Sequence, residues 1–150
     1  MVIEAVVTDR DGTMPFYVYG ASMAASLSRE NVEVLNPEPR TSAVQMVEIT
    51  SVTLDMFFVG QSFTPNVMKV DVEGAELMVL RGARGLLLHA SPVILCEIHP
   101  AQMQNCGSSV AELHAFLKDV GYNLQPIDEP NPMGIFHARL SRNNELPLAA

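Results

Sequence analysis

The chain has 150 residues, enough for one domain with a sizeable core, since a domain of this length buries roughly 70% of its unfolded-chain surface. Apolar residues make up 48% of the sequence and charged residues 17%, a balance typical of globular rather than disordered proteins. The net charge is −8, and the nine Lys and Arg residues are scattered, which excludes a nucleic-acid-binding surface because phosphate recognition needs clustered basic residues.

The sequence also argues against a membrane or secreted protein. No apolar run approaches the ~20 residues of a membrane-spanning helix. No basic stretch followed by an apolar core marks a secretory signal. The two cysteines, Cys96 and Cys106, make no disulfide framework, and no C-x-x-C or H-E-x-x-H spacing predicts zinc. We therefore expect a cytoplasmic protein.

The N-terminal third predicts a hairpin followed by a loop. Residues 2–7 and 13–19 are strand candidates, and the turn residues between them, 9–12, favour an N-terminal β-hairpin. Residues 20–42 are rich in Ser, Ala, Asn and Pro, which favours a surface loop. Residues 43–51 then alternate in polarity as a strand does.

A short helix is expected at residues 54–59, with Thr53 as its N-terminal cap. The next strand, residues 66–71, has apolar residues on both sides of Lys69, as expected of a strand covered on both faces. It ends at a group of carboxylates, Asp71, Glu73 and Glu76, set around Gly74. Carboxylates at a strand-to-helix turn are stabilised by the helix dipole, so a purely structural role is the alternative to a functional one.

A helix follows, because apolar residues recur there at helical spacing: Leu77, Leu80, Ala83 and Leu87. Gly82 and Gly85 favour a break within it. Residues 93–98 form a continuous apolar run typical of a buried strand. Strand, helix and strand make a βαβ unit, which places Asp71 and Glu97 at the same edge of the sheet.

The remaining residues complete the sheet. Ser109 and Glu112 match a capping box that starts a helix ending near Gly121. Residues 122–127 and 135–140 are strand candidates, the last one antiparallel. We predict one α/β domain over residues 1–150, with a mainly parallel sheet, an antiparallel last strand and a flexible tail at residues 141–150.

Three sequence blocks in the second half resemble one protein family. KVDVEGAE at residues 69–76, LRGA at 80–83 and PVILCEIHP at 92–100 resemble the C-terminal half of FkbM-type methyltransferases. The resemblance implies a partial Rossmann-like class I methyltransferase sheet. It also implies S-adenosylmethionine as cofactor and O-methylation of a hydroxyl on a sugar or natural-product acceptor.

The resemblance extends to the segment around Asp9, where an acid near a strand end faces the adenine in the family. Asp9 is therefore a candidate cofactor-binding residue, although closing a turn is its simpler role. The family's glycine-rich cofactor loop has no counterpart in this sequence, because no strand-Gly-x-Gly-helix pattern occurs. We thus expect a truncated methyltransferase-like chain that is inactive alone if the missing loop is essential.

Asp71, Glu73, Glu97 and His99 are the candidate catalytic residues at the expected sheet edge. His99 has an ordinary pKa near 6.5 and can accept a proton from a hydroxyl, while the carboxylates attract the sulfonium of S-adenosylmethionine. Hydrogen bonding to a loop is the alternative role for His99, and Glu76 is expected to be structural.

The same sequence features are compatible with two other functions. The chain is alternatively a non-catalytic homodimer or partner-binding module that pairs through an exposed sheet edge. It is alternatively a metal-dependent enzyme whose acidic rim holds magnesium or calcium through oxygen ligands. The partner of the methyltransferase is a small-molecule or sugar acceptor, and no nucleic acid or membrane is expected.

Overall fold

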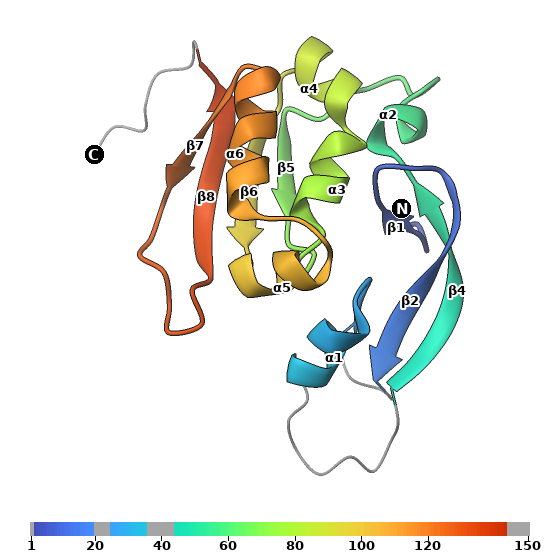
Figure 1. Ribbon diagram of the computed structural model, residues 1–150. Helices are drawn as coiled ribbons and strands as arrows, with labels where there is room; N and C mark the ends of the chain where they lie inside the picture. The colour runs from blue at the N-terminus through green and yellow to red at the C-terminus, as the bar shows by residue number, and fades with distance from the viewer. Residues whose placement is uncertain (1, 20–24, 36–43, 144–150) are drawn as a thin grey trace.

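The computed structural model describes residues 2–19, 25–35 and 44–143, which form two four-stranded sheets and the helices around them (Figure 1). The first sheet has the order β1-β4-β2-β3 and consists of β1 (Val6–Val7), β2 (Gly12–Tyr19), β3 (Ala25–Ser26) and β4 (Val44–Val52). The second has the order β5-β6-β8-β7 and consists of β5 (Val67–Val70), β6 (Val93–Ile98), β7 (Tyr122–Pro126) and β8 (Phe136–Arg142). The helices are α1 (Arg29–Leu35), α2 (Leu54–Phe57), α3 (Glu76–Arg81), α4 (Arg84–His89), α5 (Pro100–Asn105) and α6 (Val110–Asp119).

The predicted N-terminal hairpin is wrong. β1 and β2 do not pair with each other, because β4 lies between them, parallel to β1 and antiparallel to β2. The connecting turn is held against the end of β4, where the Asp11 carboxylate accepts hydrogen bonds from the Thr53 amide (2.9 Å) and hydroxyl (3.1 Å). This long-range contact, which no local turn signal reveals, directs the two strands to opposite sides of β4.

The predicted surface loop at residues 20–42 also contains regular structure. β3 and α1 lie within it, while residues 20–24 and 36–43 are outside the described part of the chain. The Ser28 hydroxyl accepts a hydrogen bond from the Asn31 amide at 3.4 Å, in the manner of a helix cap. Val32 is fully buried. The polar composition of this segment therefore concealed a short, well-packed helix.

The expectation of a mainly parallel sheet is wrong, because both sheets are mixed. β1 with β4 and β5 with β6 are parallel, whereas the other four strand pairs are antiparallel. Parallel neighbours need a crossover such as a helix, and β7 and β8 are joined by a loop without one. The predicted βαβ unit and the antiparallel last strand are confirmed. β8 extends to Arg142, so the start of the predicted tail belongs to the sheet.

The second sheet is covered by helices on one face. Val70, Ile94 and Cys96 are buried under the helices, whereas Val67 and Leu95 are 62% and 45% exposed. Burial alternates along both strands, as expected of strands with one solvated face. The prediction that these strands are covered on both faces is therefore wrong for the described residues. No helix in these ranges combines the length and apolar character needed to cross a membrane.

The break predicted near Gly82, in the helix that follows β5, is confirmed. A close backbone contact requires glycine at this position. α3 ends at Arg81 and α4 begins at Arg84, and a Cβ on Gly82 would lie 1.9 Å from the Thr8 carbonyl oxygen. Because residue 82 is glycine, the backbone between α3 and α4 can lie directly against Thr8, near the start of the chain. The sequence reasoning missed α5, which begins directly after His99 with Pro100 in its first turn.

The start of α4 is capped by a residue from a distant helix. Its own N-cap residue, Ala83, has no polar side chain, but the Asp55 carboxylate in α2 accepts hydrogen bonds from the Gly85 and Leu86 amides, each at 2.8 Å. Thr53, as predicted, caps α2 by accepting from the Met56 amide at 3.1 Å.

We expect Asp55→Ala to lower the free energy of unfolding by about 1–2 kcal/mol, because it leaves two helix-start amides without their acceptor. Urea denaturation measures this loss. Asp119→Ala is the matched control. The contact described for Asp119 is an exposed ion pair with Arg84, and no helix-start amide is described as donating to it. An equal loss in both variants would contradict the capping role.

Candidate functional site

The candidate site lies where β5 and β6 end. Their parallel register pairs Val70 with Cys96, so Asp71, just after β5, and Glu97, near the end of β6, lie at the same edge of the sheet. The structure brings Asp71, Glu73 and His99 together, with one side-chain nitrogen or oxygen atom from each within 4.8 Å of the others. The predicted juxtaposition of the two strand ends is thus found, while the catalytic roles of these residues stay predictions.

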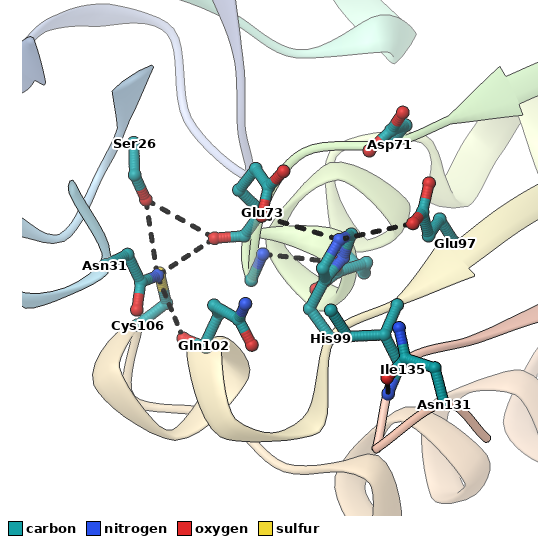
Figure 2. A network of polar contacts seen from close by, with 12 residues as sticks. Ser26, Asn31, Asp71, Glu73, Glu97, His99, Gln102, Cys106, Asn131 and Ile135 are labelled. Atoms are coloured by element: carbon teal, nitrogen blue, oxygen red, sulfur yellow. Dashed lines mark hydrogen bonds and ion pairs between the residues drawn. The ribbon is translucent and has the colours of Figure 1, made fainter. Parts of the chain in front are cut away.

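His99 is the central residue of this cluster (Figure 2). Its side chain is only 2% exposed, and its Nδ1 lies 2.7 Å from Oε1 of Glu76. Its Nε2 faces two further carboxylates, at 3.4 Å from Glu73 and 3.8 Å from Glu97. Because a carboxylate oxygen accepts, Nδ1–H donates to Glu76, and the other ring nitrogen is directed towards the remaining acids.

Glu76, which is expected to be structural, holds the imidazole of His99 in place. Its side chain is fully buried, Oε1 also accepts from the Gly74 amide at 3.1 Å, and Oε2 has no hydrogen-bond partner among the described residues. Its spacing was a usable signal, because residue 76 shares the helical stripe of the buried Leu80, Ala83 and Leu87. A carboxylate on such a stripe needs a buried partner, which here is His99.

The cluster shifts the pKa values of two of its members upward. Burial by itself lowers the pKa of His99, but the hydrogen bond to Glu76 and the charges of Glu76, Glu73 and Glu97 outweigh it and raise that pKa above its usual value. Burial raises the pKa of Glu73; the charge of His99 opposes this shift, and repulsion from the neighbouring carboxylates adds to it. Both residues therefore hold protons more tightly than they would in water.

A tight turn places Glu73 and His99 against each other. Glu73 and Gly74 both have positive φ angles, +50° and +103°. A Cβ on Gly74 would lie 2.5 Å from the backbone of Gln102 in α5. Glycine thus permits α5 to contact the turn directly, and this contact holds His99, the residue before α5, beside the turn.

A second polar network fixes the same turn from the side of α1 (Figure 2). The amide of Asn31, which is fully buried, donates to the carbonyl oxygens of Glu73 (2.9 Å) and Gln102 (3.2 Å). The Ser26 hydroxyl also donates to the Glu73 carbonyl, at 3.3 Å. Both residues lie in the segment predicted to be a surface loop, and no local pattern indicates these contacts, because they depend on tertiary packing.

A cavity of about 650 Å³ opens between the two sheets beside this turn. Asp71 and Glu73 line it from the second sheet. The rest of its wall is largely apolar and comes mainly from the first sheet, including Val6, Val7, Phe16 and Leu27. Asp9, the predicted adenine contact, is exposed and is not among the lining residues, so the structure does not bring it to the cluster.

Glu97 connects the cluster to a histidine that sequence reasoning left without a role. Its Oε2 lies 3.6 Å from Nε2 of His137, whose Nδ1 lies 2.6 Å from Asp128. His137 and Asp128 are exposed, and their contact raises the pKa of His137 and lowers that of Asp128. Glu97 therefore stands between one buried and one exposed histidine.

Comparison with known protein families gives one match. The methyltransferase FkbM domain matches residues 2–124, a range that includes Asp9, Asp71, Glu73, Glu97 and His99. No curated protein and no solved structure matches the chain.

We expect Glu76→Gln to lower the pKa of His99, because the variant removes the hydrogen-bonded charge that opposes the effect of burial. NMR titration of the histidine ring protons measures the shift. Asp128→Asn is the matched control, which should lower the pKa of His137 and leave that of His99 nearly unchanged. An unshifted His99 in Glu76→Gln would show that the buried contact does not control its protonation.

Proposed function

The chain belongs to the FkbM methyltransferase family, and on this premise we propose that it transfers a methyl group from S-adenosylmethionine to a hydroxyl group of an acceptor. The main support for the proposal is the His99–Glu76 pair, a buried imidazole held by a carboxylate, whose Nε2 lies 3.4 Å from Glu73, a residue that lines the cavity. The family resemblance supports an acceptor that is a sugar or a natural product carrying a hydroxyl group, and we propose an acceptor of this class.

The cavity suits S-adenosylmethionine in size and chemistry. Ligand pockets commonly measure about 300–1,000 Å³, are mostly apolar and carry a few polar groups. Apolar side chains such as Phe16 and Leu27 suit an adenosyl group, and the carboxylates of Asp71 and Glu73 suit a sulfonium. When bound, S-adenosylmethionine supplies an electrophilic methyl group.

The geometry around His99 supports its proposed role as the proton acceptor. Glu76 holds Nδ1–H, so the neutral ring presents the lone pair of Nε2 towards Glu73, which lines the cavity. A hydroxyl that entered beside Glu73 would give its proton to Nε2 of His99. Bound S-adenosylmethionine would supply the methyl group to the hydroxyl oxygen and would leave as S-adenosylhomocysteine. A positioned base contributes about 10²–10⁴-fold to such a reaction. The pKa of His99 is raised, so the free base forms at a higher pH than it does for an ordinary histidine. The fraction of free base grows as the pH rises through this raised pKa.

Binding calorimetry tests the donor site without knowledge of the acceptor. We expect S-adenosylmethionine to bind more tightly than S-adenosylhomocysteine, because only the former carries the sulfonium charge that Asp71 and Glu73 attract. Asp71→Asn should reduce this preference. Asp119→Asn is the matched control, since both aspartates are paired with one basic side chain, at 2.6 Å for Asp71 and 2.8 Å for Asp119. Absence of heat at millimolar S-adenosylmethionine would overturn the proposal for this chain.

A second candidate function, the homodimer, is favoured by the position of β5. β5 is an edge strand of the second sheet, and among the described residues β6 is the one strand that pairs with it. The β5 residue Val67 is 62% exposed. We propose that a second copy pairs along this open edge, because unpaired edge strands are templates for strand pairing.

Sedimentation equilibrium tests the dimer. We expect the wild-type chain to dimerise and Val67→Lys to shift it towards monomer, because the added charge blocks the edge. Val59→Lys is the matched control, since Val59 is 68% exposed and lies outside β5. A strictly monomeric wild-type chain would contradict the proposal.

A further inference from the structure

We propose that Asp71, Glu73 and His99 bind a divalent transition-metal cation of the Mn²⁺ or Zn²⁺ class. One carboxylate oxygen from each acid and one imidazole nitrogen lie within 4.8 Å of one another. Atoms that share one ion at about 2.1 Å lie no more than about 4.2 Å apart, so a small rotation closes the set. Asp71 is exposed and can make this rotation by releasing its surface ion pair with Lys69 (2.6 Å). Glu97, 3.8 Å from Nε2, can supply a further oxygen.

The orientation of His99 is the one that metal-binding histidines have. In such sites the second ring nitrogen usually donates to a carboxylate, which fixes the tautomer and the direction of the binding nitrogen. Glu76 makes this contact with Nδ1 at 2.7 Å. In the neutral ring the lone pair of Nε2 then faces the carboxylates of Glu73 and Glu97, which repel it. A positive charge at this point, either a proton or a metal cation, turns the repulsion into attraction.

Glu76 supplies a second observation that does not depend on the spacing of the ligand atoms. Its carboxylate is fully buried and directed at the imidazole, and its Oε2 has no hydrogen-bond partner among the described residues. A buried carboxylate without full compensation is unfavourable. A divalent cation on the opposite side of the imidazole would strengthen the Nδ1–H donor and add positive charge near Glu76, which would offset this cost.

The donor set indicates which cation is preferred. Carboxylates alone would suit magnesium or calcium, the choice that the acidic sequence motif suggests. The imidazole nitrogen of His99 moves the preference to transition metals, which bind nitrogen and oxygen ligands together. A cation and a proton exclude each other on Nε2, so the cation-bound protein has no free imidazole base. Cation binding itself does not depend on the proposed methyl transfer.

Calorimetry of the metal-free chain with ZnCl₂, MnCl₂ and MgCl₂, in the absence of S-adenosylmethionine, tests the site. We expect one cation per chain, with affinity falling from Zn²⁺ to Mn²⁺ to Mg²⁺. Glu76→Gln should weaken Mn²⁺ binding about 10–100-fold, because it removes the group that orients the ligand. Asp71→Asn should also weaken it, whereas Asp119→Asn should bind as the wild type does.

Equal affinity of the Asp71→Asn and Asp119→Asn variants would overturn the proposal, as would a preference for Mg²⁺. If the Glu76 variant fails to fold, pulsed electron paramagnetic resonance of Mn²⁺ on the wild-type chain decides. Coupling to an imidazole ¹⁴N is expected, and its absence would leave only surface carboxylates as ligands and reject the site. Heat with Mn²⁺ but none with S-adenosylmethionine would retain the cation site and reject methyl transfer.

Discussion

The contact between the buried carboxylate of Glu76 and the imidazole of His99 is the interaction on which the site depends. The two residues lie 23 positions apart, one in the first turn of α3 and the other just before α5, and their atoms are 2.7 Å apart. A buried carboxylate is unfavourable unless it is paired, so this contact constrains both elements. It also decides which nitrogen of His99 faces the acids at the strand ends.

The surrounding structure supports this contact through the backbone. Gly74 lets the turn after β5 touch the backbone of Gln102 in α5, and Asn31 bonds both the turn and α5 through their carbonyl oxygens. α1 and the first sheet are thereby attached to the second sheet at the point where the acids gather. The cavity between the sheets is bordered by this same turn, so the elements that fix the cluster also form part of the cavity wall.

The chemical character of the site follows from its negative charge. Glu73, Glu76 and Glu97 lie within 3.8 Å of one imidazole, and Asp71 stands close by, so positive charge is favoured at this point. The same negative electrostatic potential would attract three different cations. They are a proton on His99, a sulfonium beside Asp71 and Glu73, and a divalent metal ion on Nε2. The proposed methyl transfer would involve the first two. The proposed metal ion would compete with both, because it would occupy the same nitrogen and neutralise the same carboxylates.

Local sequence patterns correctly predict the strands at β5 and β6, the helix break at Gly82, the caps at Thr53 and Ser109, and the shared edge of Asp71 and Glu97. These features follow from side-chain periodicity, glycine and the handedness of the βαβ unit. Three other features follow from long-range packing: β4 separates β1 from β2, α1 forms in a polar segment, and Glu76 reaches His99. Each of these rests on contacts between residues distant in the chain, such as Asp11 with Thr53 and Asn31 with Glu73, which local periodicity does not encode.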